Sequence, residues 1–110
     1  MSADPDFVGF IEEQLEPLGP LASGRFFGGH ALKQDGVQFA MVMGNTLYLR
    51  VDGETRPAFK EAGCAPFSYT TKRGQVIVDS YYAAPESLMD DADELVEWAR
   101  HALAAARRAK

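Results

Sequence analysis

The sequence predicts an α+β domain in which one antiparallel sheet packs against helices. Three observations predict this class. Apolar residues recur at helical spacing near both ends of the chain, the middle alternates β-type runs with glycine-containing turns, and neighbouring runs lie close enough to pair as hairpins. We expect two layers: a sheet of about five or six strands, packed with an N-terminal helix, a short middle helix and a long C-terminal helix.

The N-terminal helix is expected to begin at Pro5. The side chain of Asp4 can cap the first turn, and proline suits the first helical position because its missing N–H has no partner there. The apolar residues at helical spacing are Phe7, Ile11, Leu15 and Leu18. Pro17 and the Gly19-Pro20 pair then end the helix.

Four strands are expected in the part of the chain that follows. They are residues 25–27, 30–33, 37–43 and 46–51. Asp35 and Gly36 separate the second strand from the third, and Asp-Gly is a strong hairpin signal because both residues tolerate the positive φ angles of a tight turn. Residues 39–43 are apolar at every position, so we expect a central strand that is covered on both faces.

A short helix and a second hairpin come next. Residues 55–62 favour a helix, because Pro57 falls in its first turn and Gly63 follows its end. Two further strands are expected at residues 67–71 and 75–82, joined by a turn at residues 72–74.

The long C-terminal helix has the clearest signals in the chain. Asp91 and Glu94 have the spacing of a capping box at its start. The apolar residues of one face are Leu95, Ala99, Ala102, Leu103 and Ala106. This helix is therefore expected to bury one face against the sheet.

Length and composition favour one globular domain over residues 1–110. Apolar residues make up 46% of the chain and charged residues 25%, the balance of a globular protein rather than a disordered one. Cys64 is the only cysteine, which excludes an internal disulfide and favours a reducing compartment. The first residues resemble no signal peptide, and no apolar run is long enough to span a bilayer. We expect a cytoplasmic protein.

The charge balance bears on the kind of partner. A net charge of −5 argues against a general phosphate-binding surface. Four basic residues nevertheless cluster at the C-terminal end: Arg100, Arg107, Arg108 and Lys110. Cations at a helix C-terminus interact favourably with the helix dipole, which accounts for this cluster without a ligand.

Few residues could support catalysis. The two histidines, His30 and His101, have no metal-ligand spacing, and one cysteine cannot supply a paired metal half-site. We expect no catalytic residues, no metal and no cofactor. A thiol enzyme with Cys64 as nucleophile and His30 as base is a remote alternative. The ordinary explanation of Cys64 is a small buried side chain.

Aromatic and basic residues are interleaved on the predicted strands. The aromatic residues are Phe26, Phe27, Tyr48, Tyr69, Tyr81 and Tyr82, and the basic ones are Arg25, Arg50, Lys72 and Arg73. Tyrosine and arginine dominate protein–protein hot spots, whereas aromatics beside cations on a sheet also suit single-stranded nucleic acid. A third interpretation is that most of these rings belong to the core. Between the two partners, the acidic balance favours a protein.

Several segments in order resemble the N-terminal domain of the TfoX family. They include Arg-Phe-Phe-Gly-Gly-His-Ala-Leu at residues 25–32 and Ser-Tyr-Tyr-Ala-Ala-Pro-Glu at residues 80–86. The other segments are residues 36–42, 47–52, 59–63, 66–69, 95–100 and 104–107. The resemblance covers about residues 7–108.

The resemblance implies a two-layer α+β domain of the kind that this family shares with type III secretion chaperones. It also implies a part in regulating natural competence. Longer members look like coactivators that act with a cyclic-AMP receptor protein and carry a second, C-terminal domain. This chain ends shortly after the long helix, so we expect a stand-alone N-terminal domain without the C-terminal one.

The leading hypothesis is a non-enzymatic cytoplasmic regulator that binds a protein, such as the transcription machinery or a cyclic-AMP receptor-type regulator. The residues proposed for binding are Arg25, Phe27, Gly28, Gly29, Tyr48, Arg50, Tyr81 and Tyr82. The two glycines could serve backbone geometry alone. The alternative is a nucleic-acid-binding domain that uses the Tyr/Arg face with Arg50, Lys72, Arg73 and the basic C-terminus. The sequence leaves a homodimer open.

Overall fold

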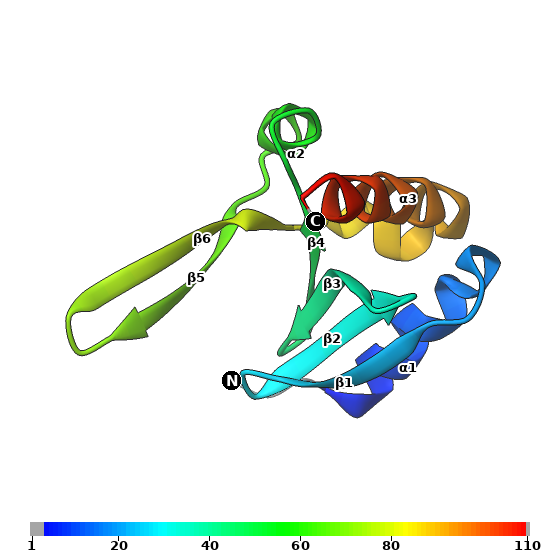
Figure 1. The fold of residues 1–110 in the computed structure, drawn as a ribbon, viewed down its shortest axis with the longest axis horizontal. Helices are drawn as coiled ribbons and strands as arrows, with labels where there is room; N and C mark the ends of the chain where they lie inside the picture. The colour runs from blue at the N-terminus through cyan, green and yellow to red at the C-terminus, as the bar shows by residue number, and fades with distance from the viewer. Residues whose placement is uncertain (1–3, 110) are drawn as a thin grey trace.

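The computed structural model describes residues 4–109 and has the predicted α+β architecture (Figure 1). The helices are α1 (Pro5–Gln14), α2 (Arg56–Glu61) and α3 (Ala92–Arg108), and short 3₁₀ turns cover Glu16–Leu18 and Glu86–Asp90. The strands are β1 (Ala22–Phe26), β2 (Gly29–Gln34), β3 (Val37–Met43), β4 (Thr46–Arg50), β5 (Pro66–Thr71) and β6 (Gly74–Ala83). The expected order of helices and strands is confirmed. Within residues 4–109, no helix combines the length and the apolar character needed to cross a membrane.

The six strands form one antiparallel sheet in the order β1-β2-β3-β4-β6-β5. Strand β6 pairs with β4 only near its C-terminal end, where Arg50 lies opposite Tyr81. Its pairing with β5 shifts register there, because Pro66 lies opposite Tyr82 while Phe67 lies opposite Val78. Residues 79–81 therefore have no partners in β5. The outer part of the β5–β6 hairpin leaves the sheet at this irregularity and projects from the body (Figure 1).

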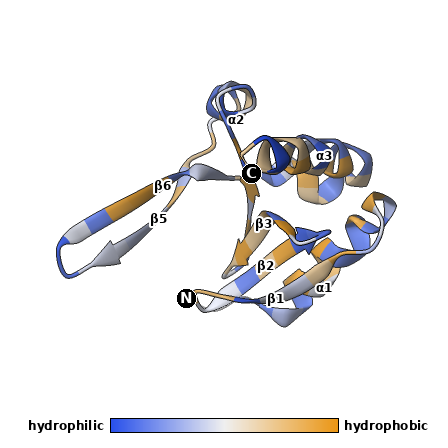
Figure 2. Cartoon of the chain, in the orientation of Figure 1, coloured by the Kyte–Doolittle hydropathy of each residue, from blue (hydrophilic) through white to orange (hydrophobic). Residues whose placement is uncertain are grey.

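Helices α1 and α3 cover one face of the sheet and form the main core with it. The predicted caps are present: the Asp4 side chain accepts a hydrogen bond from the Asp6 N–H at 2.9 Å, and that of Asp91 from the Glu94 N–H at 3.2 Å. Every residue predicted on the apolar face of the last helix is buried, and so are Val96 and Ala105. Figure 2 shows the apolar strands β3 and β4 at the centre of the molecule.

The other face of the sheet carries a second apolar cluster made only of strand residues. Its buried members are Met41, Met43, Phe67 and Tyr81, and Phe26, Tyr48 and Val78 pack against them. We call this side of the sheet the open face. Strand β3 is buried on both sides from Phe39 to Met43, as predicted. Its cover on the open face, however, comes from side chains of other strands rather than from a helix.

Candidate functional site

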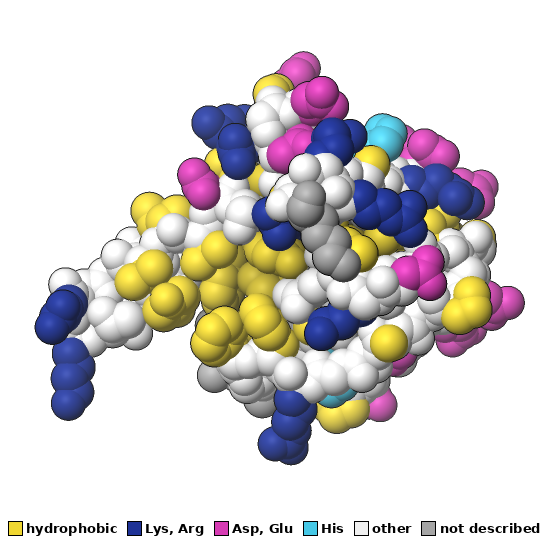
Figure 3. Space-filling view, viewed as in Figure 1, with side chains coloured by type: hydrophobic (Ala, Val, Ile, Leu, Met, Phe, Trp, Pro, Cys, Tyr) yellow, Lys and Arg dark blue, Asp and Glu magenta, His cyan; other side chains and the backbone are white. Residues whose placement is uncertain are grey.

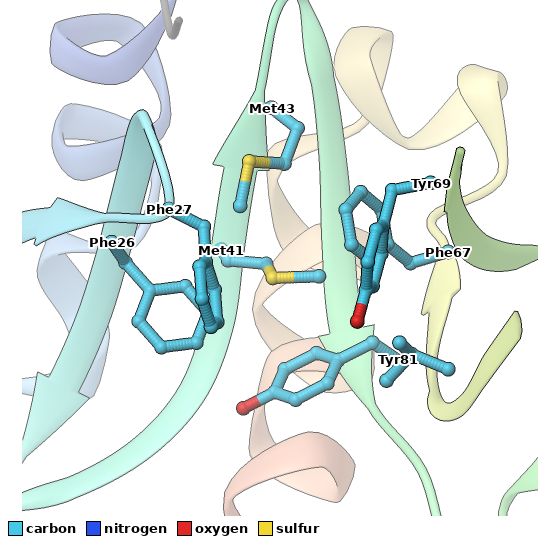
Figure 4. A pocket seen from close by; sticks show the side chains of 8 residues that line it. Phe26, Phe27, Met41, Met43, Phe67, Tyr69 and Tyr81 are labelled. Atoms are coloured by element: carbon cyan, nitrogen blue, oxygen red, sulfur yellow. The ribbon is translucent and has the colours of Figure 1, made fainter. Parts of the chain in front are cut away.

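An apolar pocket lies on the open face, between the β1–β2 turn and the projecting hairpin. Its volume is about 340 Å³. Figure 3 shows apolar side chains gathered in the hollow beside the hairpin. Figure 4 shows Met41 and Met43 between two aromatic walls. Phe26 and Phe27 form one wall, and Phe67 and Tyr69 form the other.

The floor of the pocket follows from the alternation of β3. Val42 points into the helix-covered core, so its neighbours Met41 and Met43 point to the open face. Gly29 on β2 lies against this floor. A Cβ atom at Gly29 would meet the Val42 carbonyl oxygen and the Met43 sulfur, so only glycine allows this approach.

The first wall contains the most exposed large apolar side chain among the described residues. Phe27 is 82% exposed, and its ring meets the edge of Phe26 with centroids 4.7 Å apart. Phe27 and Gly28 form a two-residue turn with φ angles of 49° and 82°, because Phe26 pairs with Gly29. The prediction that residue 27 ends a strand is therefore wrong, since that residue lies in the turn.

The second wall is built by the hairpin. Phe67 meets Tyr48 edge to face with centroids 5.1 Å apart, and Tyr69 lies 6.0 Å from Phe67. Tyr69 is 46% exposed and forms the outer rim. Burial raises the pKa of the Tyr48 phenol. The hairpin thus supplies aromatic rings that β4 anchors to the sheet.

Tyr81 lies at one end of the pocket, next to a cation. The Arg50 guanidinium carbon is 5.8 Å from the centroid of the Tyr81 ring, because the two residues are paired across β4 and β6. Burial raises the pKa of the Tyr81 phenol and outweighs the opposing effects of Gln38 and Arg50. The Arg50 Nε is buried and has no hydrogen-bond partner among the described residues.

The pocket is suited to binding apolar groups. Its lining side chains are aromatic, aliphatic or methionine, and they include neither a carboxylate nor an imidazole. Methionine adapts to irregular shapes, and aromatic rings offer large contact areas. Contiguous exposed apolar surface of this kind marks sites of interaction. In residues 4–109 no group of three or more His, Cys, Asp or Glu side chains is placed to hold a metal ion.

The structure brings four of the sequence-predicted residues to the open face: Phe27, Tyr48, Arg50 and Tyr81. Gly28 and Gly29 are adjacent to them, and their role is to allow the turn and the close approach to β3.

Two predicted residues do not belong to this surface. Tyr82 is 5% exposed and packs in the helix-covered core, 6.1 Å from Phe59 between ring centroids. Arg25 is exposed, but its side chain lies on the helix-covered face of the sheet. Arg25 is paired with His30 and His30 with Val42, and directly paired residues share a face; Val42 belongs to the helix-covered core. Strand alternation and register therefore separate these residues from the others.

Sequence reasoning missed much of the pocket. The sequence pattern indicates Phe26 and Tyr69 only as strand aromatics, and it does not distinguish Met41, Met43 and Phe67 from other apolar residues. The useful signal is the unbroken apolar run at residues 39–43. Such a strand needs a cover on its second face, and a partly covered face leaves a pocket.

The basic residues of the nucleic-acid alternative do not all share one surface: Arg50 lines a hollow with Ala106 and Ala109 at the end of α3, whereas two others are remote. Lys72 and Arg73 lie at the end of the hairpin, far along the longest axis of the molecule. Arg107 Nη2 donates to Gln34 Oε1 at 2.8 Å. Arg108 Nε donates to Asp52 Oδ2 at 2.7 Å. This bond, with the hydrogen bonds from the backbone N–H groups of residues 54 and 55, holds the pKa of Asp52 well below its usual range.

The residues of the thiol-enzyme alternative are also apart. His30 lies on β2, whereas Cys64 lies next to β5 at the far end of the strand order. Four strand spacings of about 4.8 Å separate these positions. Cys64 is half-buried against the core, and burial raises the pKa of its thiol.

The fold and the pocket define an α+β domain that presents an apolar pocket on the open face of its sheet. A family model described as the TfoX N-terminal domain matches residues 13–106, nearly the whole chain. The chain therefore belongs to the TfoX N-terminal domain family. No curated protein shows a significant match to it.

Proposed function

We propose that this domain is a non-enzymatic regulatory module that binds another protein through the open-face pocket. The observation that carries the proposal is the conformation and exposure of Phe27. The large apolar ring of Phe27 is exposed to solvent at the rim of an apolar pocket. Its backbone has a positive φ angle, which phenylalanine disfavours.

The cost of this arrangement can be judged within the same sheet. The β2–β3 turn has the same two-residue geometry, with φ angles of 52° at Asp35 and 78° at Gly36. Asp-Gly is a favoured pair in such a turn, whereas a left-handed conformation costs most other residues roughly 1–2 kcal/mol. Strained backbone of this kind clusters at functional sites. Phe27 is therefore best explained by what its ring binds.

A partner that covers Phe27 would remove its exposed ring from water, which favours binding. Burying an exposed phenylalanine ring contributes about 1.5–3 kcal/mol. Aromatic anchors near the centre of an interface carry most of the binding energy, and adjacent contacts exclude water. Phe26, Phe67 and Tyr69 line the same pocket as Phe27 and offer those contacts. Binding of a large apolar side chain is the activity that this geometry supports best.

The biological setting of the proposal rests on the family. The resemblance to competence regulators supports a cytoplasmic role in transcription control. The partner that we propose is accordingly a component of the transcription machinery or a cyclic-AMP receptor-type regulator. Because the pocket lacks an acid–base pair, we propose recognition without chemistry.

Affinity capture with paired variants tests the proposal. The tagged domain is incubated with lysate of its source organism, and bound proteins are identified by mass spectrometry. Phe27→Asn removes the ring and places asparagine where the turn favours it. We expect the wild-type domain to retain a specific protein that Phe27→Asn does not retain.

The matched control is Ile77→Thr on the opposite side of the hairpin. Ile77 is 61% exposed, but it neighbours Val76 and Val78, whose side chains face the other way. Threonine keeps the β-branched shape that a strand prefers. This variant should capture the same protein as wild type. Equal capture by Phe27→Asn would show that the pocket is not the binding site.

A further inference from the structure

Arg50 lies in a second hollow that adjoins the apolar pocket. This hollow has a volume of about 380 Å³, and Phe26 and Tyr81 line both spaces. The Arg50 guanidinium is 5.8 Å from the Tyr81 ring centroid. If a side chain of a bound peptide occupies the pocket beside Tyr81, the next one or two residues of that peptide lie close to the Arg50 guanidinium.

Among the described residues, Arg50 contacts an aromatic ring but forms no ion pair. It is the only charged side chain among the described residues that line the two hollows. The ion pairs found in residues 4–109 involve Arg100 and Arg108, not Arg50. Its buried Nε also makes no hydrogen bond with a described residue. A buried donor without a partner is unfavourable, and the guanidinium that carries it lines the hollow without an acidic side chain of the described residues beside it.

The charge of this site is opposite to that of the molecule. The chain carries a net charge of −5, yet the hollow beside the pocket presents a cation. Arginine binds carboxylates through paired N–H donors, and such bonds strengthen where water is partly excluded. The complementary ligand joins a large apolar side chain to a nearby carboxylate.

We propose that the open-face pocket receives a segment of a partner protein in which a large apolar side chain is followed closely by an Asp or Glu. The apolar side chain packs on Met41 between the aromatic walls. The carboxylate binds the guanidinium of Arg50 in the adjoining hollow. This inference rests on the proposed function, since it specifies the chemistry of the partner for the same pocket.

Selection from a random-sequence peptide library on the intact domain tests the inference. Peptides are counter-selected on Phe27→Asn, and those that survive are synthesised with a fluorescent label. Each is paired with a version in which the carboxylate beside the apolar residue is replaced by its amide. Dissociation constants are then measured by fluorescence polarisation on the wild-type domain and on Arg50→Gln.

We expect selected peptides to pair an apolar residue with an acidic one. A charge-assisted hydrogen bond predicts that amide replacement weakens binding to the wild-type domain about tenfold or more. On Arg50→Gln the two versions should bind within about twofold of each other, because the cation that distinguishes them is gone. Amide replacement on the peptide needs no protein variant, so the test stands even if Arg50→Gln misfolds.

Two outcomes would overturn the inference, and they differ in what they imply. Peptides that need Phe27 but tolerate amide replacement would refute the acidic partner and leave the proposed function intact. Failure to select any peptide that needs Phe27 would refute both. A preference for lysine or arginine beside the apolar residue would also refute the acidic partner, because Arg50 would repel a second cation.

Discussion

Phe27 and Asp35 occupy equivalent positions in two turns of the same sheet. Each is the first residue of a two-residue turn, each has a positive φ angle, and each precedes a glycine. Aspartate is ordinary at this position and phenylalanine is not. The two turns thus provide an internal comparison for the role of the Phe27 side chain.

Replacing Phe27 by asparagine should leave the domain more stable than replacing it by alanine. Both variants lose the contact with Phe26, but asparagine adopts the left-handed conformation with less strain. We expect a difference of about 0.5–1 kcal/mol in the free energy of unfolding. Urea denaturation measures this difference in free energy, provided that both variants show the same dependence of unfolding free energy on urea concentration. Equal stabilities would mean that the turn is not strained by its side chain.

Replacing Gly29 by alanine should destabilise the domain by about 1–3 kcal/mol, the usual cost of an overpacked site. The new methyl group would press on the Val42 carbonyl and the Met43 side chain. Gly24→Ala is the matched control, because nothing lies within 4 Å of a Cβ at that position in β1. The control should change stability by at most about 0.5 kcal/mol. If both variants unfold at the same urea concentration, the close approach at Gly29 does not constrain the fold.

The pair of Asp52 and Arg108 should make stability depend on pH in the acid range. The folded-state pKa of Asp52 lies well below its unfolded value of about 3.9. Its contribution is therefore fully present above that unfolded value and is lost as the pH falls through the folded one. Asp52→Asn should lower the urea midpoint at pH 7 but converge with wild type in acid. Arg108→Gln should remove the part of this pH dependence that Arg108 causes, whereas the backbone hydrogen bonds to Asp52 should keep the rest. If the effects of the two substitutions are additive in the double variant, the residues do not interact.

Cys64 should react slowly with iodoacetamide at neutral pH. Its thiol pKa is raised by burial, so less thiolate is present than in a free cysteine. The rate should rise only as the pH exceeds the ordinary thiol range. Alkylation followed by mass spectrometry gives this profile, with glutathione as the reference thiol. Rapid modification at neutral pH would revive the thiol-enzyme alternative.

Much of the fold could be predicted from local signals. Asp4 and Asp91 identify helix starts, and Asp35-Gly36 identifies a hairpin, because caps and tight turns depend on a few adjacent residues. Local signals place Phe27 at the end of a strand, because phenylalanine favours strands and rarely occupies such a turn. Only the pairing of Phe26 with Gly29 reveals that turn.

The site could be predicted only in part. The sequence indicated aromatic and basic strand residues, and Phe27, Tyr48, Arg50 and Tyr81 do share the open face. It could not separate Tyr81 from Tyr82, since adjacent residues point to opposite faces and the pattern does not tell which face the helices cover.

By itself, the sequence determined the α+β class, the order of helices and strands, and the presence of one strand with an unbroken apolar run at residues 39–43. The tertiary structure alone decided that helices α1 and α3 pack on the same face and that the hairpin leaves the sheet at residues 79–81. The physical reason is the range of the interactions. Caps and turns act over a few residues, whereas the pocket arises from packing between β1, β3 and β5, which meet only in the folded sheet.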